Sequence, residues 1–272
     1  MSQATATISP ETVERFHRDG AVELRGVLDP GQVELLAAGV ERNLAEPSEL
    51  AIRTEDGDAP GAFFEDFCNW RRIEGFERAI RELPLAAIAA ALTGSSDVRL
   101  FHDHVLVKEP GTTTRTPWHQ DQPYYCIDGA QTVSFWIPLD PVPRESTLEF
   151  VAGSHAAGTW FMPRTFVEET PMVFEPGTLA DVPDIDADRD AHEILGWSLE
   201  PGDAVAFHML TLHAAAGSRA RRRAFSLRLI GDDVTFAPRP HRTSPPFEGL
   251  ESELDAGAPM DHPLFPVLHP AG

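Results

Sequence analysis

Hydrophobic residues recur at helical spacing over the first part of this chain, residues 1–95. Ser9 stands before a proline and a glutamate, an order typical of a helix start, and Phe16 follows on the apolar face of the predicted helix. A second start lies at Asp29, where Gln32 completes a capping box and VELLAAGVERNL continues at helical spacing. Between these helices, the alternating segment AVELRGVL at 21–28 predicts a short strand.

The rest of the N-terminal part predicts a loop followed by helix. Residues 46–61 are polar and contain proline and glycine, which indicates a loop. Helical spacing returns between Phe76 and Leu92 and stops at Gly94. Pro84 lies inside this stretch, and a proline removes a helical hydrogen bond, so we expect a kink or a division into two helices.

Short segments of alternating polarity replace the helical pattern from Val98 onward. Glycine and proline turns separate them, which is typical of an antiparallel β sandwich or barrel. The segments alternate too little with helices for a doubly wound sheet. The predicted strands lie within VRLFHDHVLVKEPG, TVSFWIPLDPV, STLEFVAGSH, DAVAFHML and RAFSLRLIGDD.

These patterns predict one domain over residues 1–272, mainly β with outer helices. Its parts are a mostly helical segment at 1–95, a β core at 96–235 and a C-terminal tail at 236–272. Residues 156–200 are rich in proline and aspartate and have weak periodicity, which predicts a long excursion over the sheet. Long irregular loops in compact domains often form lids or binding loops.

The charge balance narrows the range of partners. The chain has 42% hydrophobic residues, and 22 Lys and Arg face 43 Asp and Glu, for a net charge of −21. A surface this negative repels phosphate backbones and anionic lipids, so we expect neither nucleic acid nor membrane as a partner. A small anionic ligand would need a local cluster of arginine or lysine. The two cysteines, Cys68 and Cys126, are far apart, which argues against a disulfide framework and a thiolate zinc site.

The sequence predicts a cytoplasmic location. The N-terminal residues MSQATATISPE lack the basic and apolar regions of a signal peptide, and the longest apolar stretch, at 83–92, is too short to span a bilayer. We expect a monomer or weak dimer whose partner is a small-molecule substrate.

Two His-x-Asp triplets are candidates for metal ligands: His17 with Asp19, and His119 with Asp121. The first pair lies in a predicted helix, where residues two apart point about 200° apart and cannot share one ion. The second pair follows Pro117 in a predicted strand, where residues two apart share a face. His119 and Asp121 are therefore the better candidates.

A third ligand should come from a later strand, and the spacing leaves several histidines open. Two histidines and one carboxylate with open positions on one face suit a non-haem Fe(II) oxygenase. The structural alternative is that these histidines are ordinary core or surface residues. The candidates for the third ligand are His155, His192, His208 and His213.

Four segments in order resemble the phytanoyl-CoA dioxygenase (PhyH) family of Fe(II)/2-oxoglutarate-dependent oxygenases: TPWHQDQPYY, FWIPLDPV, LEFVAGSH and LHAAAGSRARRRAFSLR. The opening VERFHRDGAVELRGVL is also similar, so the resemblance covers residues 8–235. It implies a double-stranded β-helix (jelly-roll) core with helices outside. It also implies the cofactors Fe(II) and 2-oxoglutarate, with O2, and the metal and catalytic triad His119, Asp121 and His213.

The resemblance further implies an arginine that binds the distal carboxylate of 2-oxoglutarate. The run after the distal histidine aligns best at Arg222, with Arg223 second. A guanidinium group binds a buried carboxylate through two parallel hydrogen bonds and supplies the local positive charge that a dianion needs. Trp136 and His104 match family positions close to the cosubstrate.

The implied reaction is hydroxylation or desaturation of a small organic metabolite, with release of succinate and CO2. Related halogenases lack the triad carboxylate, so Asp121 favours hydroxylation or desaturation over halogenation. Aromatic and amide groups beside the triad suit a substrate with some polar handles, and residues 156–200 would close over it. The candidate substrate residues are Gln120, Gln122, Tyr124 and Tyr125.

Two other classes remain open from the sequence. A non-redox metal-dependent isomerase or hydrolase of the cupin type would have no use for Arg222. A metal-free jelly-roll binding protein would need neither the triad nor its geometry. Succinate release that depends on Fe(II) and 2-oxoglutarate would separate both from the oxygenase.

Overall fold

The structure is a computed structural model that describes residues 8–55, 57, 60–164, 172 and 179–270. The two predicted N-terminal helices are present with the expected caps: the Ser9 side chain accepts a hydrogen bond from Thr12 N, and Asp29 and Gln32 form the capping box. The stretch around Pro84 is divided into two helices, one of the two outcomes expected there. The helices are α1 (Pro10–Asp19), α2 (Pro30–Ala45), α3 (Glu74–Glu82) and α4 (Leu85–Thr93).

The segment predicted as a loop at 46–61 contains a strand, which corrects that expectation. Strand β2 (Ile52–Glu55) pairs with β3 (Ala62–Phe67) as a hairpin at the edge of a sheet. Three of the four β2 residues are exposed, so the strand lacks the alternation of buried and exposed positions that predicts a strand from sequence. Its pairing with the buried strand β3, rather than its own hydrophobicity, makes it a strand.

Two sheets form the β core. The larger has the order β1-β10-β7-β12-β4-β3-β2, with β14 also paired to β4, and the smaller has the order β5-β11-β8-β9. A third, two-stranded sheet pairs β13 with β6. The remaining strands are β1 (Ala21–Leu24), β4 (Val98–Lys108), β5 (Thr116–His119), β6 (Ile127–Asp128), β7 (Thr132–Pro138), β8 (Leu148–Val151), β9 (Ile194–Leu195), β10 (Ala204–Phe207), β11 (His213–Ala215), β12 (Arg222–Ile230), β13 (Thr235–Phe236) and β14 (Val267–His269).

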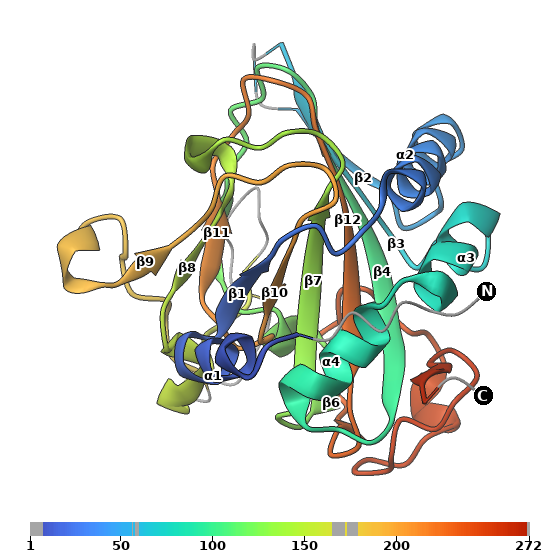
Figure 1. Ribbon diagram of the computed structural model, residues 1–272. Helices are drawn as coiled ribbons and strands as arrows, with labels where there is room; N and C mark the ends of the chain where they lie inside the picture. Colours follow the sequence, from blue (N-terminus) through green and yellow to red (C-terminus); the bar gives the residue numbers. More distant parts are fainter. Residues whose placement is uncertain (1–7, 56, 58–59, 165–171, 173–178, 271–272) are drawn as a thin grey trace.

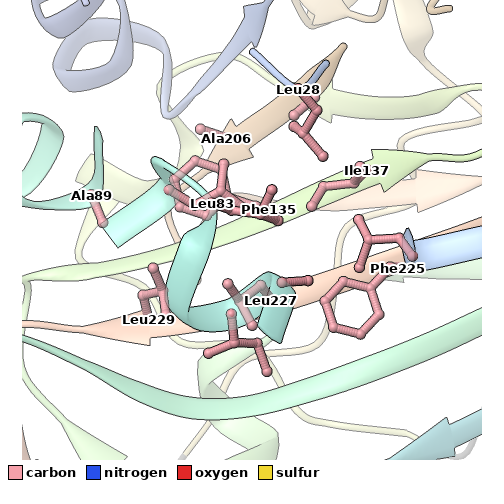
Figure 2. Packing of buried hydrophobic residues seen from close by; sticks show 14 of the residues in the cluster. Leu28, Leu83, Ala89, Phe135, Ile137, Ala206, Phe225, Leu227 and Leu229 are labelled. Carbon is pink, nitrogen blue, oxygen red and sulfur yellow. The ribbon is translucent and has the colours of Figure 1, made fainter. Parts of the chain in front are cut away.

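The sheets face each other as the two halves of a jelly roll, and helices α2, α3 and α4 lie along the outer side of the larger sheet (Figure 1). The main hydrophobic core fills the layer between these helices and the sheet. Figure 2 shows its centre, where Leu83 and Ala89 from the helical layer meet Phe135, Phe225 and Leu227 from β7 and β12. The expected fold, mainly β with outer helices, is confirmed.

Strand β12 shows how this layering creates a site. Successive residues of a strand point to opposite faces, so Phe225, Leu227 and Leu229 pack toward the helices. The alternate residues, including Ser226 and Arg228, face the space between the sheets. Apolar side chains on one face thus hold a row of polar side chains in the interior of the jelly roll.

The C-terminal tail completes the larger sheet. Strand β14 pairs with β4, placing Val267 opposite Arg99, and Met260 and Phe265 are buried against Phe101 in a second core cluster. Part of the predicted excursion, residues 165–171 and 173–178, lies outside the described residues. Among the helices that the structure describes, none combines the length and apolar character required to cross a bilayer.

Candidate active site

His119, Asp121 and His213 come together at the junction of two strands of the smaller sheet. His119 ends β5 and His213 begins β11, and the two residues are direct partners in the antiparallel pairing of these strands. Asp121 Oδ1 lies 3.6 Å from His119 Nε2 and 3.7 Å from His213 Nε2. All three residues are buried, and they form the one group of possible metal ligands found in the described part of the chain.

Both imidazole rings are oriented by backbone carbonyl groups. His119 Nδ1 donates to Pro117 O at 2.8 Å, and His213 Nδ1 donates to Thr211 O at 2.9 Å. A proton held on Nδ1 leaves the Nε2 lone pair of each ring facing the carboxylate of Asp121. Two Nε2 lone pairs and a carboxylate oxygen are a donor set for a divalent transition metal, and such carbonyl partners are typical of metal-binding histidines. The three residues therefore fit a metal ion.

The second oxygen of Asp121 is held by two residues that the sequence analysis did not identify. Ser134 Oγ donates to Asp121 Oδ2 at 2.9 Å, and Arg228 Nη2 lies 3.3 Å from the same oxygen. Burial would raise the pKa of Asp121, but the cationic Arg228 and the histidines outweigh it and hold this pKa well below its usual range. Asp121 is thus ionised, as a metal ligand must be.

Burial has the opposite effect on His213. It lowers the pKa of this imidazole to about 3, with a further contribution from nearby His119. The neutral ring is the form that binds a metal, because a protonated Nε2 has no free lone pair. The electrostatics of the site therefore favour a negative carboxylate beside a neutral imidazole.

The triad opens into a cavity of about 290 Å³ between the two sheets. Its walls carry residues from β2, β3, β4, β7, β10 and β12 on one side and from β5, β8 and β11 on the other. Five residues singled out from the sequence line it with the triad: His104, Tyr124, Tyr125, Trp136 and Arg222. Several apolar residues complete the walls: Ile52, Phe67, Leu106, Leu148, Met172 and Phe207.

Arg222 is a buried cation in this cavity. Its guanidinium lies 5.6 Å above the ring of Trp136, and its Nη1 donates to Ser146 O. Within the part of the chain that the structure describes, no carboxylate forms an ion pair with Arg222, and burial lowers its pKa to about 10. The side chain is still charged near neutral pH and can bind an anion.

Arg223 points away from the cavity. Its guanidinium binds Asp140 at 2.7 Å and Glu41 at 2.8 Å, so two carboxylates already neutralise it. Arg223 is a neighbour of Arg222 on the same strand, and neighbours on a strand face opposite sides. Of the two arginines considered from the sequence, the structure places Arg222 with the triad.

Gln120 and Gln122 are not brought to the cavity. The Gln120 amide donates to Thr159 O and Leu210 O and accepts from Phe161 N, which ties the start of the excursion to the triad segment. The Gln122 amide donates to Gly129 O at 2.9 Å. Both side chains bind backbone groups and do not line the substrate side.

The two tyrosines beside the triad do line the cavity. Tyr124 packs edge-on against the His119 ring, and its hydroxyl group donates to Arg164 O at 2.8 Å. The Tyr125 hydroxyl accepts a hydrogen bond from Arg228 Nε at 3.2 Å. Tyr125 thus supports the arginine that holds Asp121.

Comparison with known proteins gives a family match for most of the chain. A sequence model of the family described as phytanoyl-CoA dioxygenase (PhyH) matches residues 16–224. A search of curated proteins found no match. Among solved structures, the non-heme alpha-ketoglutarate-dependent carbocyclase SnoK from nogalamycin biosynthesis is 23% identical, with a TM-score of 0.75 over 98% of this chain and 99% of that chain.

Two further solved structures carry bound ligands. The epimerase SnoN, in complex with Fe3+, alpha-ketoglutarate and nogalamycin RO, is 25% identical, with a TM-score of 0.73 over 95% of this chain and 97% of that chain. EctD from S. alaskensis, with 2-oxoglutarate and 5-hydroxyectoine, is 18% identical, with a TM-score of 0.66 over 95% and 90% of the two chains. The family match spans most of this chain, and the resemblance seen in its sequence motifs is confirmed: the chain belongs to the phytanoyl-CoA dioxygenase (PhyH) family.

Proposed function

We propose that this protein is an oxygenase that hydroxylates a small organic molecule, with desaturation as the alternative outcome of the same chemistry. It is a non-haem, 2-oxoglutarate-dependent enzyme whose cofactors are iron and 2-oxoglutarate, with O2 as the cosubstrate. The observation that carries the proposal is the cavity shared by the triad and Arg222, a buried arginine with no carboxylate partner in the described chain.

His119, Asp121 and His213 would hold the iron through Nε2, Oδ1 and Nε2. When bound, iron and 2-oxoglutarate supply the oxidation of a C–H bond by O2, with release of succinate and CO2. The protein contributes position and charge. Pro117 O and Thr211 O fix the two rings, and Arg228 with Ser134 fixes the carboxylate, so the donor atoms are oriented before metal binds.

Arg222 would bind the distal carboxylate of 2-oxoglutarate. Its guanidinium offers parallel N–H donors that match a carboxylate, and the face of Trp136 limits its freedom. Because Arg222 is buried, the ion pair would form where water does not screen it. This role distinguishes the proposed oxygenase from a non-redox isomerase or hydrolase of similar fold, in which Arg222 would have no ligand to bind.

Hydroxylation is preferred over halogenation because Asp121 is present in the triad. The carboxylate would occupy a coordination position that a halide would otherwise need. The tyrosines and the apolar residues of the cavity would hold the substrate against the metal and exclude water.

Turnover without added substrate tests the reaction class. Purified protein incubated with Fe(II), 2-oxoglutarate and O2 should release succinate slowly, and the same protein with a chelator, or with the His119→Ala substitution, should not. Exposed His17→Ala serves as the matched control, because it changes the other His-x-Asp triplet and should leave succinate release unchanged. Equal succinate release by wild type and His119→Ala would reject the proposal.

A further inference from the structure

One wall of the cavity is formed by neighbouring strands β2, β3 and β4 of the larger sheet. Ile52 on β2 lies opposite Glu65 on β3, and Glu65 lies opposite Leu106 on β4. Two pairs along, Phe67 lies opposite His104. Directly paired residues share a face, so all of these side chains point to the same side of the sheet, and each lines the cavity.

Glu65 is the acidic residue of this apolar wall. It is buried, 5% exposed, and its Oε1 lies 3.3 Å from His104 Nε2. The His104 ring is held in place by stacking on Phe67, with the ring centres 4.0 Å apart. His104 Nε2 is buried without a well-directed hydrogen bond to any described residue. The two side chains therefore form a rigid polar pair whose hydrogen-bonding capacity is not used within this part of the protein.

No lysine or arginine of the described chain lies within ion-pair distance of Glu65. Lys108, the single lysine of the sequence, donates its Nζ to Thr114 O and Ala216 O, and Arg228 forms its ion pair with Asp121. Burying a carboxyl group without a cation is costly, and burial raises the pKa of Glu65 to about 7. Buried carboxyl groups without a cation are common at binding sites, where a ligand supplies the missing partner.

We propose that Glu65, together with His104, binds a hydrogen-bond-donating group, a hydroxyl or an ammonium, on an otherwise apolar substrate. This inference rests on the proposed function, because it assigns the substrate class of the same cavity. The donor would bind a Glu65 oxygen, and a hydroxyl could also accept a hydrogen bond from the Glu65–His104 pair when one of the two carries the proton.

The charges of the cavity favour such a donor over an acidic group. The two buried arginines have partners of their own: Arg228 binds Asp121, and Arg222 is assigned to 2-oxoglutarate. An acidic substrate near Glu65 would meet a second carboxyl group, and the third arginine that lines the cavity, Arg164, is paired with Asp181 at 2.7 Å. The surrounding Ile52, Phe67 and Leu106 match an apolar skeleton instead. Glu65 is thus assigned to specificity and positioning, and not to the oxidation itself.

Three probes with one skeleton test this assignment: 1-adamantanamine, 1-adamantanol and adamantane-1-carboxylate. Binding is measured by calorimetry on the full chain loaded with 2-oxoglutarate and Mn(II), which takes the place of iron and prevents turnover. The amine, the alcohol or both should bind the wild type, and the carboxylate should bind at least tenfold more weakly. If only one donor probe binds, that result supports the proposal and identifies the donor.

Substitutions then test the residue. Glu65→Gln should weaken amine binding about tenfold or more, since a charge-assisted hydrogen bond is lost, but should weaken alcohol binding only a few-fold. Glu65→Leu should remove the binding of both. The melting temperature of Glu65→Leu should equal or exceed that of the wild type, because a buried carboxyl without a cation does not stabilise the fold. A structural role for Glu65 predicts a lower melting temperature instead.

The matched control is Glu55→Gln, the same change at an exposed position of the same hairpin, which should bind the probes like the wild type. The proposal is overturned if neither donor probe binds the wild type, if the carboxylate binds as well as the donors, or if Glu65→Leu binds unchanged. A separate calorimetric titration measures the binding of 2-oxoglutarate and Mn(II) to the wild type without any probe. Failure of that titration rejects the proposed function, whereas the probe titrations report on Glu65.

Discussion

Arg228 Nη2 lies 3.3 Å from Asp121 Oδ2, while Oδ1 of the same carboxylate lies 3.6 Å from His119 Nε2 and 3.7 Å from His213 Nε2. Asp121 thus divides its oxygens between a fixed cation and the imidazole pair. Both members of the ion pair are buried, with Asp121 4% and Arg228 6% exposed. A buried charge that loses its partner is strongly destabilising, so the metal site and the fold share this contact.

Replacing this arginine should therefore affect both metal affinity and stability. Arg228→Met leaves the Asp121 carboxylate buried without its cation, and we expect the free energy of unfolding to fall by about 3–5 kcal/mol in urea titrations. Loss of a residue that orients a metal ligand should weaken Mn(II) binding, measured by calorimetry, about 10–100-fold.

A milder variant keeps this test interpretable if Arg228→Met does not fold. Ser134→Ala removes the hydrogen bond to Asp121 Oδ2 at a cost of about 1 kcal/mol, and should also weaken Mn(II) binding. Exposed Arg219→Met is the control and should match the wild type in both measurements. Unchanged Mn(II) affinity in Arg228→Met and Ser134→Ala would show that the contact does not orient the carboxylate.

The sequence could predict that His119 and Asp121 act together, but the strand expected to carry both ends at His119, and Asp121 has helical backbone angles just before a short 3-10 helix at Gln122–Tyr124. Gln120, between them, points elsewhere and binds Thr159 O and Leu210 O, contacts to distant segments that no local pattern reveals. The choice of His213 over the other histidines could not come from spacing. It required the family resemblance, because contacts between strands far apart in the chain leave no local pattern.

The position of Arg228 could have been predicted from the spacing of polar residues along its strand. On β12, Arg222, Ser226 and Arg228 lie an even number of residues apart, so they share the face that looks into the cavity. A charged residue in a strand suggests an exposed position, and burial by the second sheet cannot be seen locally. Glu65 was not identified from the sequence for a related reason. Its strand, β3, pairs with β2, and the exposed residues of β2 have no hydrophobic period that would predict the hairpin.

Substitutions of Arg222 and Arg223 should have different effects on the KM for 2-oxoglutarate. Arg222→Ala removes the charge proposed to bind the distal carboxylate of 2-oxoglutarate, a loss typically worth about 2–5 kcal/mol when buried. The KM for 2-oxoglutarate, measured by succinate release, should then rise by a factor of tens or more. Arg223→Ala breaks the contacts with Asp140 and Glu41 and should lower stability while leaving this KM unchanged. The reverse pattern would assign the cosubstrate to Arg223.

Stability should depend on pH through Asp66, which is fully buried. Burial would raise its pKa, but hydrogen bonds from Ser48 N and Asn43 Nδ2, each 2.8 Å long, contribute to a net shift below the usual value. A lowered folded-state pKa gives stability that is present above the unfolded pKa, about 3.9, and is lost as the pH falls through the lower folded value.

The comparison of Asp66→Asn with the wild type tests this sign. At pH 7 the variant should be less stable by about 1–3 kcal/mol, because hydrogen bonds to a charged group are lost, and the difference should shrink below about pH 4. Urea titrations from pH 7 to pH 3 measure it. Asp255→Asn, at an exposed position, should show no such trend. A difference that grows toward acid pH would contradict the direction of the shift.

The last prediction concerns the outcome of the reaction and depends on Asp121. Its carboxylate would fill a ligand position that a halide would need, and Arg228 with Ser134 fixes the orientation of this carboxylate. In a metabolite screen, the compound that most stimulates succinate release should yield a hydroxylated product carrying oxygen-18 from labelled O2, or a desaturated product. No chlorinated product should form even in high chloride.

Asp121→Gly removes one negative charge from the donor set, so it should bind Mn(II) more weakly and lose hydroxylation. Asp128→Gly, an exposed change outside the cavity, is the control. Chlorination by the wild type, or product formed without O2 consumption, would remove the chain from the hydroxylases and desaturases, because a complete triad would leave no ligand position for halide and both of these reactions consume O2.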